Sequence, residues 1–225
     1  MTALKPALPQ LVRVAMMAAI TLSAMEVCQS ASELAVVLNA NELEMPEPVL
    51  PDVLSAADRE AARSANIAAF SAVKSTLETM SLSRSLILMA LAGCASMAFL
   101  ASLRIRWPSG FPRSASARLI GGAAFAAALF RTLDGAQSLV IARRSADAAI
   151  KAIEKLPTVD YPTSLLVVVP TVMNIGLTSL IVGLFLLIGH YFRSDRVQTM
   201  FIALDGPNPS LTTSRRLRFL SLRFQ

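Results

Sequence analysis

Two long runs without a charged residue constrain this chain more than any other feature of its sequence. Residues 85–103 lie between Arg84 and Arg104, and residues 164–189 extend uncharged to His190. A helix needs about 20 mainly apolar residues to cross roughly 30 Å of hydrocarbon. Each run therefore predicts a membrane-spanning helix.

The composition of the chain agrees with a membrane protein. Of its 225 residues, 54% are hydrophobic and only 16% are charged, and the mean hydropathy is +0.57. An average soluble domain is less apolar than this, and a disordered chain has the reverse composition. A disulfide scaffold is also excluded, because a bridge would require Cys28 to reach the depth of Cys94 in the uncharged run.

Two further spans are expected, and both contain charged residues. Residues 119–142 have the right length but include Arg131 and Asp134. Residues 14–33 reach the length of a span only if Glu26 enters the membrane, so a signal peptide or an organelle presequence is the alternative interpretation. With this helix retained, we predict an all-α integral membrane protein, a four-transmembrane-helix bundle with an extramembrane helical hairpin extension.

Basic residues predict the orientation, because loops rich in Lys and Arg stay on the cytoplasmic side. The loop after the second span holds four arginines and no acid, and the C-terminal tail holds six arginines against two acids. We therefore expect residues 1–13, 104–118 and 190–225 inside, and residues 34–84 and 143–163 outside. A bacterial inner (plasma) membrane is the favoured location, with an organelle inner membrane as the alternative.

The outer region opens with a proline cluster, Pro46, Pro48 and Pro51, after which Ser55 and Asp58 predict the start of a helix. Two apolar stripes at helical spacing flank spans two and three: Ile67, Phe70, Val73, Leu77 and Met80, and Ala146, Ala149, Ile150, Ile153 and Leu156. We expect the stripes to pack together as the outer half of a long antiparallel hairpin. Alternatively, they lie on the membrane surface or cover another subunit.

Polar residues inside the predicted spans are the candidate functional residues. Arg131 at the centre of a span costs at least about 2.5 to 3.5 kcal/mol, and such residues pair or line a polar pathway. Asp134 shares its helix face at a spacing of three. Glu26 and Arg131 each lie 13 residues beyond an interfacial arginine, about 20 Å deep, so they are expected at one level. The hypothesis is a buried network of Glu26, Arg131, Asp134, Gln137 and Asn174.

Small residues within the spans predict close helix packing. The positions expected at the contacts are Ala92, Ser96, Gly122, Ala126, Gly176 and Gly183. Pro170 removes a backbone donor from the fourth span and is expected to bend or open that helix, unless it is an ordinary proline near the end of the span.

The polar network has two functional interpretations. As a structural lock it fixes helix register, which fits a structural or assembly subunit of a larger membrane complex or a homo-oligomer. As a transport or proton pathway, it fits a small transporter or channel component that uses Arg131 and Asp134. A third alternative is that Arg131 reaches a headgroup or water and forms no network.

We found no motif for catalysis, and an enzyme is not expected. His190 is the single histidine, and no pattern predicts a metal site or a cofactor. The C-terminal segment places Arg215, Arg216, Arg218 and Arg223 among apolar residues, which suits an anionic membrane surface. No folded nucleic-acid reader accompanies these arginines, so nucleic acid is not an expected partner.

Overall fold

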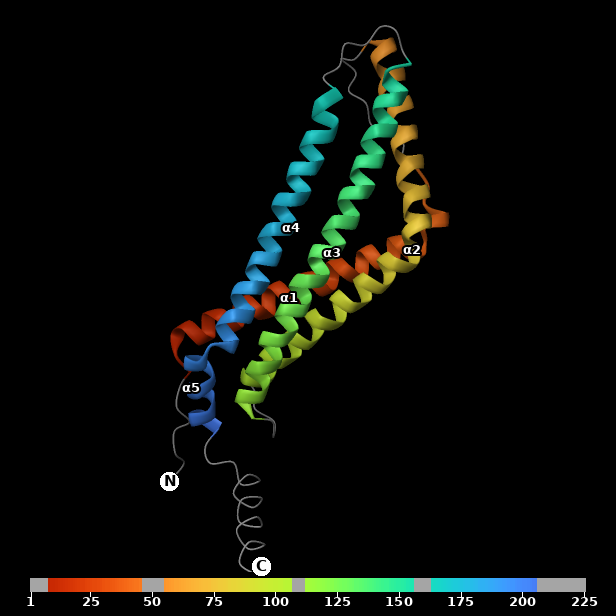
Figure 1. Ribbon diagram of the computed structural model, residues 1–225. Helices are drawn as coiled ribbons and strands as arrows, with labels where there is room; N and C mark the ends of the chain where they lie inside the picture. The colour runs from red at the N-terminus through yellow and green to blue at the C-terminus, as the bar shows by residue number, and fades with distance from the viewer. Residues whose placement is uncertain (1–7, 46–54, 107–111, 156–162, 206–225) are drawn as a thin grey trace, which may run out of the picture.

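The structure, a computed structural model, describes residues 8–45, 55–106, 112–155 and 163–205. All regular elements in these ranges are helical (Figure 1). They are α1 (Gln10–Leu38), η1 (Ala40–Glu42), α2 (Ala56–Arg106), α3 (Arg113–Ile153), α4 (Thr163–Arg193) and α5 (Asp195–Asp205). Helices α1 to α4 are long and apolar enough to cross a membrane, which confirms an all-helical protein with four candidate spans.

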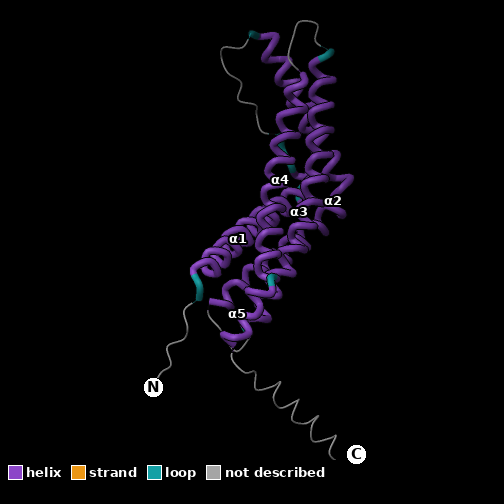
Figure 2. Tube along the Cα trace, turned by 60° about the vertical axis from the view of Figure 1, so that its left-hand side comes forward, coloured by secondary structure: helices purple, strands orange, loops and turns teal. Residues whose placement is uncertain are grey.

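Helices α2 and α3 form a long antiparallel hairpin and lie side by side in both views (Figures 1 and 2). Helix α2 has 51 residues, about 75 Å at 1.5 Å per residue, which is more than twice the thickness of a hydrocarbon core. Its first turn is capped by Ser55, whose hydroxyl accepts a hydrogen bond from the backbone N–H of Asp58 at 3.1 Å. The predicted helix start after the proline cluster is therefore present, although the prolines themselves lie outside the described residues.

The bundle has two unlike halves. In the lower half of Figure 1, α1 runs along the last part of α2 and crosses α3, while α4 and α5 complete the packing. In the upper half, only α2, α3 and α4 remain, and α2 changes direction between the two halves. The main hydrophobic core lies in the lower half, where Phe185, Phe192 and Phe201 are almost fully buried.

Helix α1 enters this core along one regular stripe. Its buried residues are Val12, Met16, Ala19, Ser23, Glu26, Ser30 and Val37. Steps of four and three residues keep these positions on one helix face, as in a coiled-coil seam. Glu26 therefore occupies a position that the neighbouring turns fill with small or apolar side chains.

The predicted outer halves of α2 and α3 pack together, but through only part of the stripe predicted on α2. Val73 and Leu77 lie in one apolar cluster with Ile141 of α3 and with Val37 and Ala40 at the end of α1. Ile67, by contrast, is 46% exposed. Farther from the hairpin turn, the contact between the two helices is formed by Ala65, Ala69, Ala149 and Ile153, and the small side chains allow the two backbones to come close. Leu156 of the predicted partner stripe lies outside the described residues.

The glycines at the close contacts differ from those predicted. A Cβ added to Gly122, Gly176 or Gly183 would meet nothing within 4 Å, so those predictions are wrong. A Cβ at Gly135 would lie 2.5 Å from Cγ2 of Thr178, and one at Gly121 would lie 2.5 Å from Cγ of Arg193. Helices α3 and α4 therefore touch at these two points. Helix α4 is continuous through Pro170, so the helix does not open there, and the expected bend stays a prediction.

The first part of the predicted basic tail is helical and packs on the bundle. Helix α5 packs Val197 and Phe201 against the core. The carboxylate of Asp205 then accepts hydrogen bonds from the backbone N–H groups of Arg113 and Ser114, at 2.7 and 2.9 Å. These groups open α3 and have no partner within their own helix, so α5 caps α3.

Candidate functional site: a buried ion cluster

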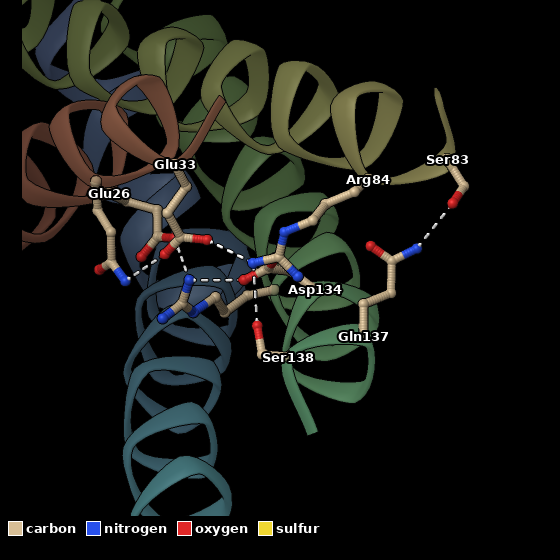
Figure 3. Close-up of polar contacts among 9 residues, drawn as sticks. Glu26, Glu33, Ser83, Arg84, Asp134, Gln137 and Ser138 are labelled. Carbon is tan, nitrogen blue, oxygen red and sulfur yellow. Dashed lines mark hydrogen bonds and ion pairs between the residues drawn. The ribbon is translucent and has the colours of Figure 1, made fainter. Parts of the chain in front are cut away.

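Five charged side chains from three helices meet where α1 crosses the hairpin (Figure 3). Helix α1 contributes Glu26 and Glu33, α2 contributes Arg84, and α3 contributes Arg131 and Asp134. We call these five residues the ion cluster. The two glutamates lie seven residues apart, which is two helical turns, so α1 presents both to the hairpin.

Arg131 joins α3 to α1. Its Nη1 lies 3.3 Å from Oε1 of Glu26 and donates a hydrogen bond of 2.9 Å to Oδ2 of Asp134. The structure thus brings together the three charged residues that spacing and depth placed at one level. The pair within α3 is therefore not self-contained, because a second helix supplies another carboxylate.

Arg84 joins α2 to both other helices. Its Nη2 donates hydrogen bonds to Oε2 of Glu33 at 2.8 Å and to Oγ of Ser138 at 3.1 Å, and it lies 3.2 Å from Oδ1 of Asp134. Figure 3 shows the guanidinium between Glu33 and Asp134. Asp134 therefore contacts both arginines and is the centre of the cluster.

Most of the ion cluster is shielded from the surroundings. Glu26 and Asp134 are each 2% exposed, whereas the side chain of Glu33 is 29% exposed. Burying a charge is costly unless opposite charges and hydrogen bonds compensate for it. The ion pairs supply part of that compensation, and Glu33 lies at the edge of the cluster.

The charges of the ion cluster do not balance. Three carboxylates face two guanidinium groups, which leaves one excess negative charge when all five are ionised. Hydrogen bonding is also incomplete: Nη1 of Arg84 and Nε of Arg131 are buried and have no acceptor among the described residues. The cluster therefore combines short ion pairs with buried guanidinium nitrogens that have no hydrogen-bond acceptor among the described residues.

Two amides of the predicted network behave differently from its charged members. Gln137 is adjacent to the cluster, but its amide donates to Oγ of Ser83 at 3.4 Å and its Oε1 has no hydrogen-bond partner among the described residues. Asn174 is half-buried on α4, and no hydrogen bond within the described ranges joins it to Gln137. Gln137 lies 19 residues beyond Arg118, and Asn174 lies 19 residues before Arg193, but this equal depth does not bring the two amides together. Gln29 instead supports the cluster by donating to Glu33 at 3.0 Å.

The sequence-based reasoning missed Glu33 and Arg84, which it treated as the ends of spans. A usable signal lies in the hairpin itself. Arg84 is 22 residues before the end of α2 at Arg106, and Asp134 is 21 residues after the start of α3 at Arg113. Counting from the turn of an antiparallel hairpin therefore predicts that Arg84 and Asp134 lie opposite each other.

The remaining predicted features lie away from the ion cluster or outside the described part of the chain. Arg215, Arg216, Arg218 and Arg223 lie outside the described residues. His190 is exposed near the end of α4. Within the described ranges, no group of three His, Cys, Asp or Glu residues could hold a metal ion. Comparison with family models, curated proteins and solved structures finds no match.

Proposed function

We propose that this chain is a multi-pass membrane protein that acts as a non-enzymatic structural or assembly subunit, and that the ion cluster locks its helices together. One observation carries this proposal: Arg84 of α2 contacts carboxylates of both α1 and α3. With Arg131 contacting Glu26, every helix of the three is joined to another by opposite charges.

The physical reason is the cost of separation in a bilayer. A charged side chain left without its partner in hydrocarbon is strongly unfavourable, so helices that carry matching charges are held in one register. Removing one member of a buried pair costs about 3 to 5 kcal/mol because the other charge remains. Such a lock selects one arrangement of α1 against the hairpin.

The surface of α4 is where we propose that the chain meets its neighbours in the membrane. In its outer half, Val172, Met173 and Leu177 are each more than half exposed, and Val168, Val169, Ile175 and Leu180 are similarly exposed. No described part of this chain covers them, so lipid, other subunits or further copies of the chain are the proposed contacts. The basic C-terminal tail is proposed to contact anionic lipid.

A transporter or channel component is the alternative, and the excess negative charge of the ion cluster is the observation that favours it. A carboxylate without its own guanidinium could take up and release a proton. Two of the cavities among the described residues are lined by none of the five cluster residues. We prefer the structural role because the ion pairs of Arg84 join α2 to both α1 and α3.

A double-mutant cycle tests the lock. Arg131→Gln leaves two excess negative charges, so we expect a loss of about 3 to 5 kcal/mol in the free energy of unfolding. Glu26→Gln removes the excess charge and should cost less than about 1 kcal/mol. The double variant should be more stable than Arg131→Gln alone, as measured by unfolding in mixed micelles. Additive losses would show that the two residues are not coupled and would remove the basis for the lock.

Native mass spectrometry tests the subunit role and the retention of α1. The full chain extracted in mild detergent should keep the mass of α1 and carry further subunits or copies. A chain without its first 24 to 35 or so residues would lose half or more of α1, the helix that carries Glu26 into the ion cluster. Normal abundance of Arg131→Ala, together with loss of an ion or solute flux, would instead favour the transporter.

A further inference from the structure

A cavity of about 420 Å³ lies at the end of the bundle opposite the outer halves of α2 and α3. It is formed where α1 and α3 begin and α2 ends. Its lining residues are Leu8, Arg13, Met16, Met17, Arg106 and Arg113. This is the same end of the molecule at which α5 caps α3.

The cavity concentrates positive charge from three helices. Arg13 belongs to α1, Arg106 to α2 and Arg113 to α3, and no acidic residue is in the lining that the structure describes. Like charges repel, and no acid in the described lining offsets the charges of Arg13 and Arg113. An anion in the cavity would offset them.

Two of the arginines lack a competing carboxylate. Neither Arg13 nor Arg113 forms an ion pair with a described residue. The Nε of Arg113 is buried without a hydrogen-bond partner in the described part of the chain, whereas the Nε of Arg13 donates to the Leu8 carbonyl at 2.9 Å. The carboxylate of Asp205 accepts from the backbone at the start of α3 and from the Ser114 hydroxyl.

The remaining wall is apolar, which favours a lipid over a small free anion. Leu8, Met16 and Met17 complete the lining, and the Nη1 of Arg106 lies 3.9 Å from the Sδ of Met17. Met17 is 48% exposed, so it presents an apolar surface beside the arginines that an acyl chain would contact.

We infer that this cavity binds the phosphate of an anionic phospholipid in the leaflet at this end of the bundle. Guanidinium groups bind phosphate oxygens through paired, charge-assisted hydrogen bonds, and basic pockets between membrane helices suit lipid headgroups. This inference rests on the membrane location proposed above but not on the subunit role. It is also separate from the C-terminal tail.

Lipid titration of the full chain, followed by native mass spectrometry, tests the site. Phosphatidylglycerol should bind more tightly than phosphatidylcholine, which has the same phosphate diester but no net negative charge. Each arginine near a headgroup is worth about a fivefold change in affinity, so Arg13→Gln with Arg113→Gln should weaken phosphatidylglycerol binding about 25-fold. If the double variant does not fold, the single variants are measured instead, and each should bind phosphatidylglycerol about fivefold more weakly.

Arg143→Gln with Arg144→Gln is the matched control, since both arginines are exposed on α3 far from the cavity. It removes the same charge and should leave binding within about twofold. Equal binding of the two lipids, or full binding by the cavity variants, would overturn the site. Displacement of phosphatidylglycerol by millimolar inorganic phosphate would assign the cavity to a free anion and overturn the lipid. The lipid preference is measured on the isolated chain. The result therefore does not depend on whether the chain assembles with other subunits.

Discussion

The burial of the Asp134 carboxylate depends on arginines from two helices. It contacts Arg131 on its own helix at 2.9 Å and Arg84 on α2 at 3.2 Å, and it is 2% exposed. Neither arginine alone explains why an acid is stable at this position. The two together do, because opposite charges reach both carboxylate oxygens.

Arg84→Gln is predicted to destabilise the protein strongly. The change removes the charge that joins Glu33 to Asp134 and leaves the ion cluster with two excess negative charges. We expect a loss of about 3 to 5 kcal/mol in the free energy of unfolding in mixed micelles. Arg143→Gln removes an exposed arginine and should change it by less than about 0.5 kcal/mol. Similar values for the two variants would contradict the central role of Arg84.

Glu33→Gln is predicted to have a small effect, because Glu33 differs from the other acids in exposure. Its side chain is 29% exposed, and the substitution also removes the excess negative charge. The free energy of unfolding should fall by less than about 1 kcal/mol, since the amide oxygen still accepts from Arg84. A loss as large as that of Arg84→Gln would mean that the cluster requires its full negative charge.

Among the helices, α3 is the one that organises the molecule. It packs against α2 along its length, meets α4 at Gly121 and Gly135, and is capped by Asp205 of α5. Alanine-rich surfaces on α3 allow these close approaches: Ala117, Ala124 and Ala127 are fully buried. The small residues of α3 therefore determine how closely its neighbours pack.

Gly135→Ala is predicted to separate α3 from α4. The new methyl group would lie 2.5 Å from Cγ2 and 2.7 Å from Oγ1 of Thr178, so one helix must shift. Overpacking of this kind costs about 1 to 3 kcal/mol. Gly122→Ala is the control on the same helix: its methyl group meets nothing within 4 Å, and it should be neutral or stabilising by up to about 1 kcal/mol. Thermal unfolding in detergent compares the two.

Asp205→Ala is predicted to release α5 from the start of α3. The carboxylate accepts three hydrogen bonds there, from two backbone N–H groups and the Ser114 hydroxyl. Loss of a helix cap costs about 0.5 to 2 kcal/mol. Asp147→Ala, on the exposed surface of α3, should cost less than about 0.5 kcal/mol. Faster backbone hydrogen exchange at residues 113–116 in Asp205→Ala alone would locate the effect.

Across the molecule as a whole, three segments that are predicted to lie on one side of the membrane meet at one end of the bundle. Leu8 and Arg13 line the same cavity as Arg106 and Arg113, and Asp205 contacts the start of α3. The beginning of α1, the turn of the hairpin and the end of α5 therefore lie at one end of the bundle. This is the end that the arginine-rich loop predicts to be cytoplasmic.

Cysteine labelling tests this orientation. In a Cys28→Ser, Cys94→Ala background, Ala115→Cys and Glu154→Cys would place exposed thiols near opposite ends of α3. A membrane-impermeant maleimide should label the Glu154 variant from outside and the Ala115 variant only in inverted or opened membranes. The reverse pattern would invert the topology, and labelling of both from one side would show that α3 does not span.

The helical class and the four long apolar segments could be predicted from the sequence, because charge-free runs and helical periodicity are local properties. The same holds for the common depth of Glu26, Arg131 and Asp134, since a helix rises by a constant amount per residue. Counting from the hairpin turn places Arg84 opposite Asp134, but the participation of Glu33 and its ion pair with Arg84 emerged only from the folded chain. Their contacts depend on how α2 pairs with α3 and how α1 crosses both, which side-chain packing between distant segments determines.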